Sequence, residues 1–351
     1  MTYIEAVVLY CLKRINGERT IYSIYHLLKG KRSSQTIQDA HLYSLTSLFY
    51  SFPIIDRKDF EKLASRLNES NLISESEPER YILTKEGHHQ LEVFFREKPF
   101  PASLNGWLYG SSVEQLWKRL SLLVQVLSQY IRAQQKYYPV QRDRDVQRWI
   151  KRFLQEPPVP LKDLNHLLYS EMVSLAKQET FPDDAGLLIC RLTGGEYIGL
   201  TRGQAAEKYG MGEDEYWFRF LNVLHYIMQK ALEQKTLYPI LYSLILDLVP
   251  EISLTQSSEE TYKLLKRGFG IKRIAQIRRL KESTIEDHVV EIALNDSRFS
   301  IEGFIPEEEI KQVIQKAKEV NKRKLKPIKE ALPQLSYFQI RLTLARYGDR
   351  L

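Results

Sequence analysis

A run of positively charged residues in the last third of the chain is the feature with the clearest chemistry. Residues 261–281 contain eight lysines and arginines and no aspartate or glutamate. These cations are Lys263, Lys266, Arg267, Lys272, Arg273, Arg278, Arg279 and Lys281. Because clustered cations attract phosphates whatever the base sequence, the run predicts a surface that contacts a nucleic-acid backbone.

Two predicted helices carry this run. A capping box formed by Ser257 and Glu260 would begin the first helix, which should end at Gly268. The second helix should begin at Ile271 and end just before Leu280. The cations therefore lie on two short helices joined by a tight turn.

A third helix should complete a helix-turn-helix. Ser283 and Glu286 have the spacing of another capping box, and Ile285, Val289 and Ile292 recur on one face of a helix. A buried apolar face after a short helix and a turn is typical of the helix-turn-helix core.

The third helix does not have the composition of a base-reading helix. It carries Glu282, Glu286, Asp287 and Glu291, and it lacks the Arg, Asn or Gln side chains that read base edges. We therefore expect weak, sequence-independent DNA binding through the first two helices. The candidate DNA-binding residues are the eight cations together with Ser283 and Thr284.

This stretch resembles the C-terminal domain of RecQ-type helicases over about a quarter of the chain. The matching segments are Gly270-Ile271-x-x-Ile274-Ala275, Leu280-x-x-Ser283-Thr284-Ile285-x-x-His288, the sequence LKPIKEAL at 325–332, and Ser336-Tyr337-x-x-Ile340-Arg341-Leu342-x-Leu344-Ala345. Where that family often has an acid and a Gly-Leu pair, this chain has Arg273 and Arg279-Leu280. Both departures add positive charge.

The motor of those helicases is absent from the sequence. No Gly-x-x-x-x-Gly-Lys-Ser/Thr phosphate loop occurs, nor a His-Glu-x-x-His or Gly-x-Ser-x-Gly motif. Cys11 and Cys190 are the only cysteines, too few for a thiolate zinc site. We therefore predict a non-enzyme with no cofactor, no metal and no small-molecule substrate.

The combination of a RecQ-like helix-turn-helix with a different helical N-terminal half resembles the YpbB-like proteins of Bacillus and related bacteria. In that family the gene neighbours one for a RecQ-type helicase. The resemblance implies an accessory role in DNA replication, recombination or repair, with a RecQ-type helicase as partner.

The N-terminal region, residues 1–98, should form a winged-helix-like domain in a mainly α protein. Helices are expected near 3–15 and 21–28, and a third after the N-cap Asp56. A hairpin over 72–83 and a helix capped by Thr84 follow. The alternative is a generic helical domain with one exposed hairpin, and a winged helix often binds protein rather than DNA.

A helical middle domain is expected over residues 106–255, before the helix-turn-helix domain at 257–351. Residues 200–213 show a second helix-turn-helix rhythm, but its second helix opens with Glu213, Asp214 and Glu215, which would repel phosphates. We interpret it as a packing or partner-binding unit.

Two further runs of cations are ambiguous. Residues 118–152 contain nine lysines and arginines with Tyr137, Tyr138 and Trp149 interleaved. Residues 311–329 contain eight lysines and arginines against Glu319 alone. Each run could extend a nucleic-acid surface or could simply be a solvated helix face.

The net charge of +7 fits a polyanionic partner. The apolar run 236–246 is roughly half a membrane span, and the N-terminus has the wrong charge order for a secretory signal. We expect a cytoplasmic location, with the nucleoid as the alternative, and no membrane contact.

The rival functions are a winged-helix transcription regulator and a protein adaptor without DNA binding. The middle fold, the oligomeric state and the identity of the helicase or DNA structure stay open.

Overall fold

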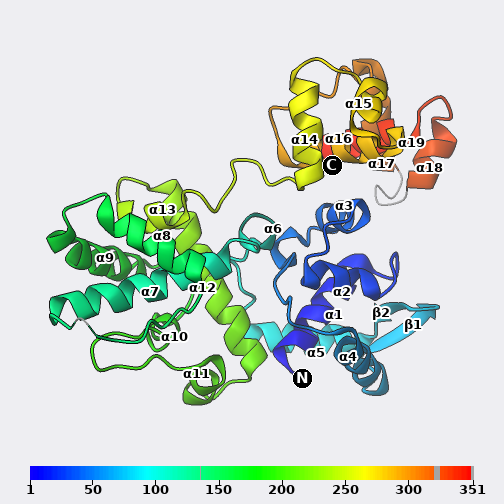
Figure 1. Ribbon diagram of the computed structural model, residues 1–351. Coiled ribbons are helices and arrows are strands. Elements are labelled where there is room, and N and C mark those ends of the chain that lie inside the picture. Colours follow the sequence, from blue (N-terminus) through cyan, green and yellow to red (C-terminus); the bar gives the residue numbers. More distant parts are fainter. Residues whose placement is uncertain (135, 320–324, 349–351) are drawn as a thin grey trace. The chain divides into compact units, whose positions relative to one another are not determined.

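The computed structural model describes residues 1–134, 136–319 and 325–348 (Figure 1). Within these ranges the protein is mainly helical, with one two-stranded sheet, which confirms the expected fold class. The chain forms two compact units. The first contains residues 1–30 and 47–250, and the second contains residues 31–46 and 251–351.

The first unit begins with the helices and hairpin expected of a winged-helix-like region. The elements are α1 (Tyr3–Ile15), α2 (Tyr22–Lys29), the 3-10 turn η1 (Thr46–Leu48) at the unit boundary, α4 (Arg57–Glu69), β1 (Ile73–Glu77), β2 (Arg80–Leu83) and α5 (Lys85–Glu97). The two predicted N-caps are confirmed: Asp56 accepts a hydrogen bond from the Asp59 amide at 2.7 Å, and Thr84 accepts one from the Gly87 amide at 3.0 Å. The strands are antiparallel, with Ile73 opposite Leu83.

The remainder of the first unit is helical. Its elements are α6 (Gly106–Tyr109), α7 (Val113–Ile131), α8 (Arg144–Gln155), α9 (Leu161–Ala176), α10 (Gly186–Ile189), α11 (Arg202–Lys208), α12 (Glu213–Glu233) and α13 (Pro239–Ile245). Helix α12 contacts α1, α7, α10, α11 and α13. Its Phe218 ring stacks on Tyr3 and on Phe52, with centroid distances of 5.4 and 5.6 Å. Burial of these rings joins the N-terminal and middle regions in one unit.

The acids that open α12 are occupied within the first unit. Glu213 pairs with Arg202 at 3.1 Å, and the Asp214 carboxylate accepts a hydrogen bond from the Ile4 amide at 2.9 Å. Glu215, which is buried, pairs with Lys98 and Arg219. The second helix-turn-helix rhythm is therefore a packing element.

The second unit is built around α16. Its helices are α3 (Ser34–Leu42), α14 (Gln256–Lys266), α15 (Ile271–Arg278), α16 (Glu282–Asn295), α17 (Glu307–Glu319), α18 (Leu325–Ala331) and α19 (Tyr337–Tyr347). Helix α16 contacts α3, α14, α15 and α19. The main core includes Val289, Ile305, Ile328 and Ile340.

Helix α3 comes from a distant part of the sequence. It lies inside the range expected for the winged-helix-like domain, yet residues 31–46 group with the second unit. Ile37 and Tyr43 are buried, and the Arg32 guanidinium donates to the Leu254 carbonyl at 3.2 Å. The second unit is therefore discontinuous in sequence.

Within the described ranges, every helix is too short or too polar to traverse a lipid bilayer.

Candidate nucleic-acid interface

Helices α14, α15 and α16 form a helix-turn-helix around a small apolar centre. Ile274, Ala275 and Ile285 are buried there, and Leu264 and Leu280 pack against them. Ala275 takes little space, which allows α15 to lie close to its neighbours. The apolar positions predicted on α16 face inward.

The helix starts differ from the predicted capping boxes. Helix α14 is capped by Thr255, whose hydroxyl accepts a hydrogen bond from the Ser258 amide at 3.2 Å, so the predicted box of Ser257 and Glu260 is wrong. Helix α16 has Lys281 as its N-cap without a side-chain hydrogen bond, so the box at Ser283 is also wrong. A capping box of Ser336 with Gln339 is present at the start of α19.

The turn between α15 and α16 requires a left-handed residue. Arg279 has a φ of 52°, and the Leu280 amide donates to the Ala275 carbonyl at 3.0 Å. A non-glycine residue in this conformation costs about 1 kcal/mol. Glycine would adopt this conformation without strain.

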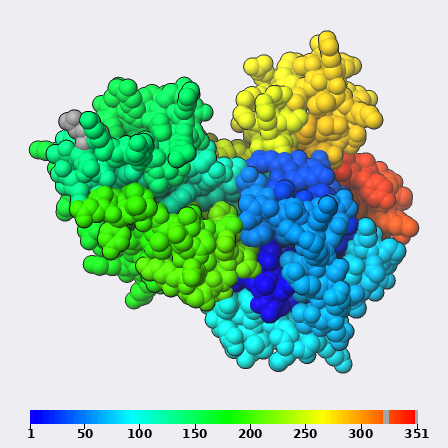
Figure 2. Space-filling model, turned by 60° about the horizontal axis from the view of Figure 1, so that its bottom comes forward, coloured from blue at the N-terminus to red at the C-terminus, as the bar shows by residue number. Residues whose placement is uncertain are grey.

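Six of the predicted cations are exposed and free of ion pairs within the part of the chain that the structure describes. They are Lys266, Arg267, Lys272, Arg273, Arg279 and Lys281. Lys266 lies over the Tyr262 ring at 4.1 Å, and Arg273 donates to the Gln276 side chain at 3.2 Å. Side chains of α14 and α15 make the yellow surface in Figure 2. We call these six residues the basic surface.

The two remaining cations have intramolecular partners. Lys263 is exposed and pairs with Glu259 one turn earlier, at 2.8 Å. Arg278 is only 12% exposed and pairs with Glu260 at 2.8 Å. Its guanidinium also donates to the Ser257 carbonyl and to the Thr261 hydroxyl. Arg278 therefore joins α15 to α14, a role that sequence spacing could not reveal.

A buried histidine lies beside this arginine. His288 is 7% exposed, and its Nδ1 lies 2.8 Å from the Thr261 hydroxyl and 3.4 Å from Arg278 Nη1. Burial, and then the positive charge of Arg278, lower the pKa of His288 to about 4. The ring is neutral at pH 7, so Nδ1 can accept these hydrogen bonds.

Helix α16 is enclosed by its neighbours. Residues from Ile285 to Ala293 are buried or half-buried. Glu291 is buried and accepts hydrogen bonds from the Thr255 amide at 2.5 Å and the Ser258 hydroxyl at 2.6 Å. Asp287 pairs with Arg341 of α19. Glu291 and Asp287 of α16 therefore serve the fold, and only the first residues of the helix, including Ser283, are exposed.

The other two cation runs have more intramolecular partners. In the middle region Arg119 is buried and pairs with Asp247, and Lys118 pairs with Glu114. A stripe along α8 remains exposed, consisting of Arg144, Arg148, Lys151 and Arg152, although Arg148 pairs with Asp145. The predicted run at 311–329 includes residues 320–324, which lie outside the described residues. Its Lys311, Lys316 and Lys326 have acidic partners.

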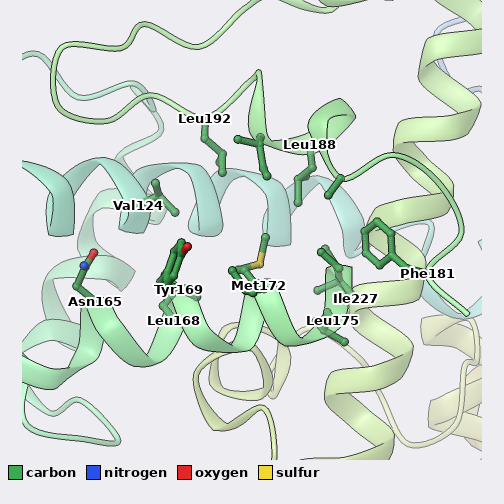
Figure 3. A pocket seen from close by; sticks show the side chains of 14 residues that line it. Val124, Asn165, Leu168, Tyr169, Met172, Leu175, Phe181, Leu188, Leu192 and Ile227 are labelled. Carbon is green, nitrogen blue, oxygen red and sulfur yellow. The ribbon is translucent and has the colours of Figure 1, made fainter. Parts of the chain in front are cut away.

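A pocket of about 250 Å³ lies in the first unit along α9 (Figure 3). Its lining is almost entirely apolar, with Leu168, Met172, Leu188 and Ile227 as typical members. Among the described lining residues, Asn165 is the only one with a side-chain amide. The described lining residues include no nucleophile paired with a base, so this pocket does not have the side chains of a catalytic site.

Two comparisons with known proteins agree with this geometry. Residues 257–344 match the family model described as a helix-turn-helix domain. The chain is also 36% identical over 350 residues to Protein YpbB of Bacillus subtilis (strain 168), a match that covers 99% of this chain and 98% of that protein. No solved structure matches. The chain belongs to the same family as Protein YpbB and carries a helix-turn-helix domain, a class of domain that binds DNA.

Proposed function

We propose that this protein is a non-catalytic, sequence-independent DNA-binding accessory factor in DNA replication, recombination or repair, acting with a RecQ-type helicase. The observation that carries the proposal is the basic surface of α14 and α15 beside an enclosed, acidic α16. Six cations without ion-pair partners among the described residues favour phosphate contact.

Major-groove reading by α16 is disfavoured on physical grounds. A recognition helix must offer one free face to base edges. Helix α16 is buried against α3, α14, α15 and α19, and its exposed start carries Glu282. DNA binding through the basic surface should therefore be weak. Its affinity should fall steeply with salt concentration and should not depend on base sequence. Ser283 and Thr284 would then contribute hydrogen bonds to phosphates.

The helicase partnership rests on the sequence resemblance. The helix-turn-helix domain resembles the tail of RecQ-type helicases, and the sequence lacks a phosphate loop for a motor. A partner helicase would supply the motor, and the first unit would dock that partner. A DNA partner would locate this activity at the nucleoid.

A pull-down of the tagged full chain from cell extract, with and without nuclease, tests the partnership. Recovery of a RecQ-type helicase in both samples supports direct contact. Recovery only without nuclease would mean that DNA bridges the two proteins, and recovery in neither would remove the partner from the proposal.

The rival function, a transcription regulator, is disfavoured by the hairpin of the first unit. Glu75, Glu77 and Glu79 lie at its tip, where a DNA-binding wing would meet phosphates. A titration of random and selected duplexes at several salt concentrations decides between the two. Discrimination of about a thousandfold or more for one sequence would favour the regulator.

A further inference from the structure

The loop between α14 and α15 presents an aromatic ring between two glycines. The Gly268 amide donates to the Leu265 carbonyl at 2.8 Å, and the Phe269 amide donates to the Leu264 carbonyl at 3.3 Å. Gly268 has a φ of 85°, and Gly270 is the N-cap of α15. This hydrogen-bond pattern is the Schellman ending of a helix, which fixes the path of the loop.

The space around Phe269 is open. A Cβ added at either glycine would meet no atom within 4 Å among the described residues. Phe269 is 38% exposed. The other phenylalanines of the second unit, Phe299, Phe304 and Phe338, form ring contacts in its core, whereas no ring contact joins Phe269 to another described aromatic residue.

Cations flank this ring on both sides along the chain. Lys266 and Arg267 precede the loop, and Lys272 and Arg273 follow it, all of them exposed. Glu260 and Glu282 are the nearest acids in sequence, and Glu260 is paired with Arg278. A stacking ring within a basic surface is the arrangement that binds single-stranded nucleic acid.

We propose that Phe269 stacks on an unpaired DNA base while the flanking cations hold the adjacent phosphates, so that the preferred substrate is single-stranded DNA or a duplex with an unpaired end. In a continuous duplex each base face is covered by its neighbours, and the ring has no partner. Because α16 cannot enter a major groove as it is packed, the loop is the part of the helix-turn-helix that meets the bases. This inference rests on the proposed function and specifies its substrate.

The test compares Phe269→Ala with Ile277→Ala in the full chain. Ile277 is 45% exposed on α15, next to the same cations, and is the matched control for loss of an exposed apolar side chain. Affinities are measured for a short oligo-dT strand and for a blunt duplex that is closed by hairpins at both ends. Unfolding midpoints of both variants verify that the unit is folded.

We expect Phe269→Ala to weaken oligo-dT binding about tenfold and to change duplex binding less than about twofold. Ile277→Ala should change neither. Phe269→Trp should keep the affinity, and its fluorescence should be quenched by oligo-dT but not by the closed duplex. The native tryptophans all lie in the first unit, so the difference from wild type isolates the new ring.

Equal losses for strand and duplex, or no loss with Phe269→Ala, would overturn the stacking role and leave the proposed function standing. Absence of binding by the wild-type chain to either DNA would instead overturn the proposed function itself.

Discussion

Two pairs of helices share the helix-turn-helix rhythm, and they differ in what surrounds them. In both α11–α12 and α15–α16, a short helix and a tight turn precede a longer helix whose start is acidic and whose body is buried. Around α12 the acids are paired with Arg202, Lys98 and Arg219. Around α16 the preceding helices keep exposed cations that have no acidic partner among the described residues.

Under the proposed function, this difference accounts for which of the two pairs would bind DNA. The longer helix has a structural role in both pairs, so its sequence does not distinguish them. The two pairs are distinguished by the unpaired cations on the segment before the longer helix. A helix-turn-helix can therefore serve packing in one unit and present exposed, unpaired cations in another, where we propose that they bind phosphates.

The largest expected effect comes from the support that α3 gives to α16. Ile37→Ala should destabilise the second unit by about 2–4 kcal/mol, because it leaves a cavity at a buried position of a helix that contacts α16. Hydrogen exchange of α16 amides should accelerate, while that of α12 should not change. Gln38→Ala, at a half-exposed position of the same helix, is the control.

Equal acceleration of hydrogen exchange in α12 would show that α12 and α16 unfold in one cooperative step. That result would contradict the separate support of the two helices by their own units.

Adjacent arginines at the end of α15 should behave in opposite ways. Arg278→Lys should lower the stability of the second unit by about 1–3 kcal/mol, because the partly buried Ser257 carbonyl and Thr261 hydroxyl lose the guanidinium as donor. Its effect on the salt dependence of DNA binding should be small, since the positive charge is kept. Chemical denaturation and DNA titration measure the two properties separately.

Arg279→Gly should raise stability by up to about 1 kcal/mol, because glycine adopts the left-handed conformation without strain. The same change should weaken DNA binding through loss of one exposed cation. Stronger or unchanged DNA binding would remove Arg279 from the basic surface.

An effect of pH is expected from the buried histidine. The unfolded chain protonates His288 near pH 6.5, whereas the folded protein does so only near pH 4. Stability should therefore fall as the pH drops from about 6.5 to about 4, by about 3 kcal/mol from this residue. His288→Asn keeps an acceptor near the Thr261 hydroxyl but does not titrate, so its stability should depend less on pH in this window.

The matched control is His88→Asn, which makes the same substitution at an exposed histidine of α5. A slope for His288→Asn equal to that of wild type would contradict a buried neutral imidazole.

Local signals in the sequence were sufficient for much of this fold. The Asp56, Thr84 and Ser336 caps and the hairpin follow from residue types within a few positions of each other. The box at Ser257 failed because several Ser and Thr residues compete to cap the same turn, and Glu291, from another helix, helps select Thr255. The box at Ser283 failed because α16 already begins at Glu282, with Lys281 as an N-cap that makes no side-chain hydrogen bond.

Long-range contacts could not be predicted in this way. Nothing in residues 31–46 indicates that α3 packs on a helix some 250 positions later. Likewise, Arg278 and Arg279 have the same side chain, and only the fold distinguishes the nearly buried one from the exposed one. Phe269 could not be singled out from the sequence, because a single phenylalanine between glycines carries no periodic signal.

The most direct test of the basic surface is the salt dependence of DNA binding by Lys272→Glu/Arg273→Glu, compared with Lys162→Glu/Lys177→Glu. Both variants change net charge equally, and Lys162 and Lys177 are exposed in the first unit. We expect the first variant to bind at least about tenfold more weakly near 100 mM salt, with the slope of log affinity against log salt flatter by about two. The second should bind as wild type does. Equal losses in both variants, or an unchanged slope in the first, would contradict DNA contact through α14 and α15.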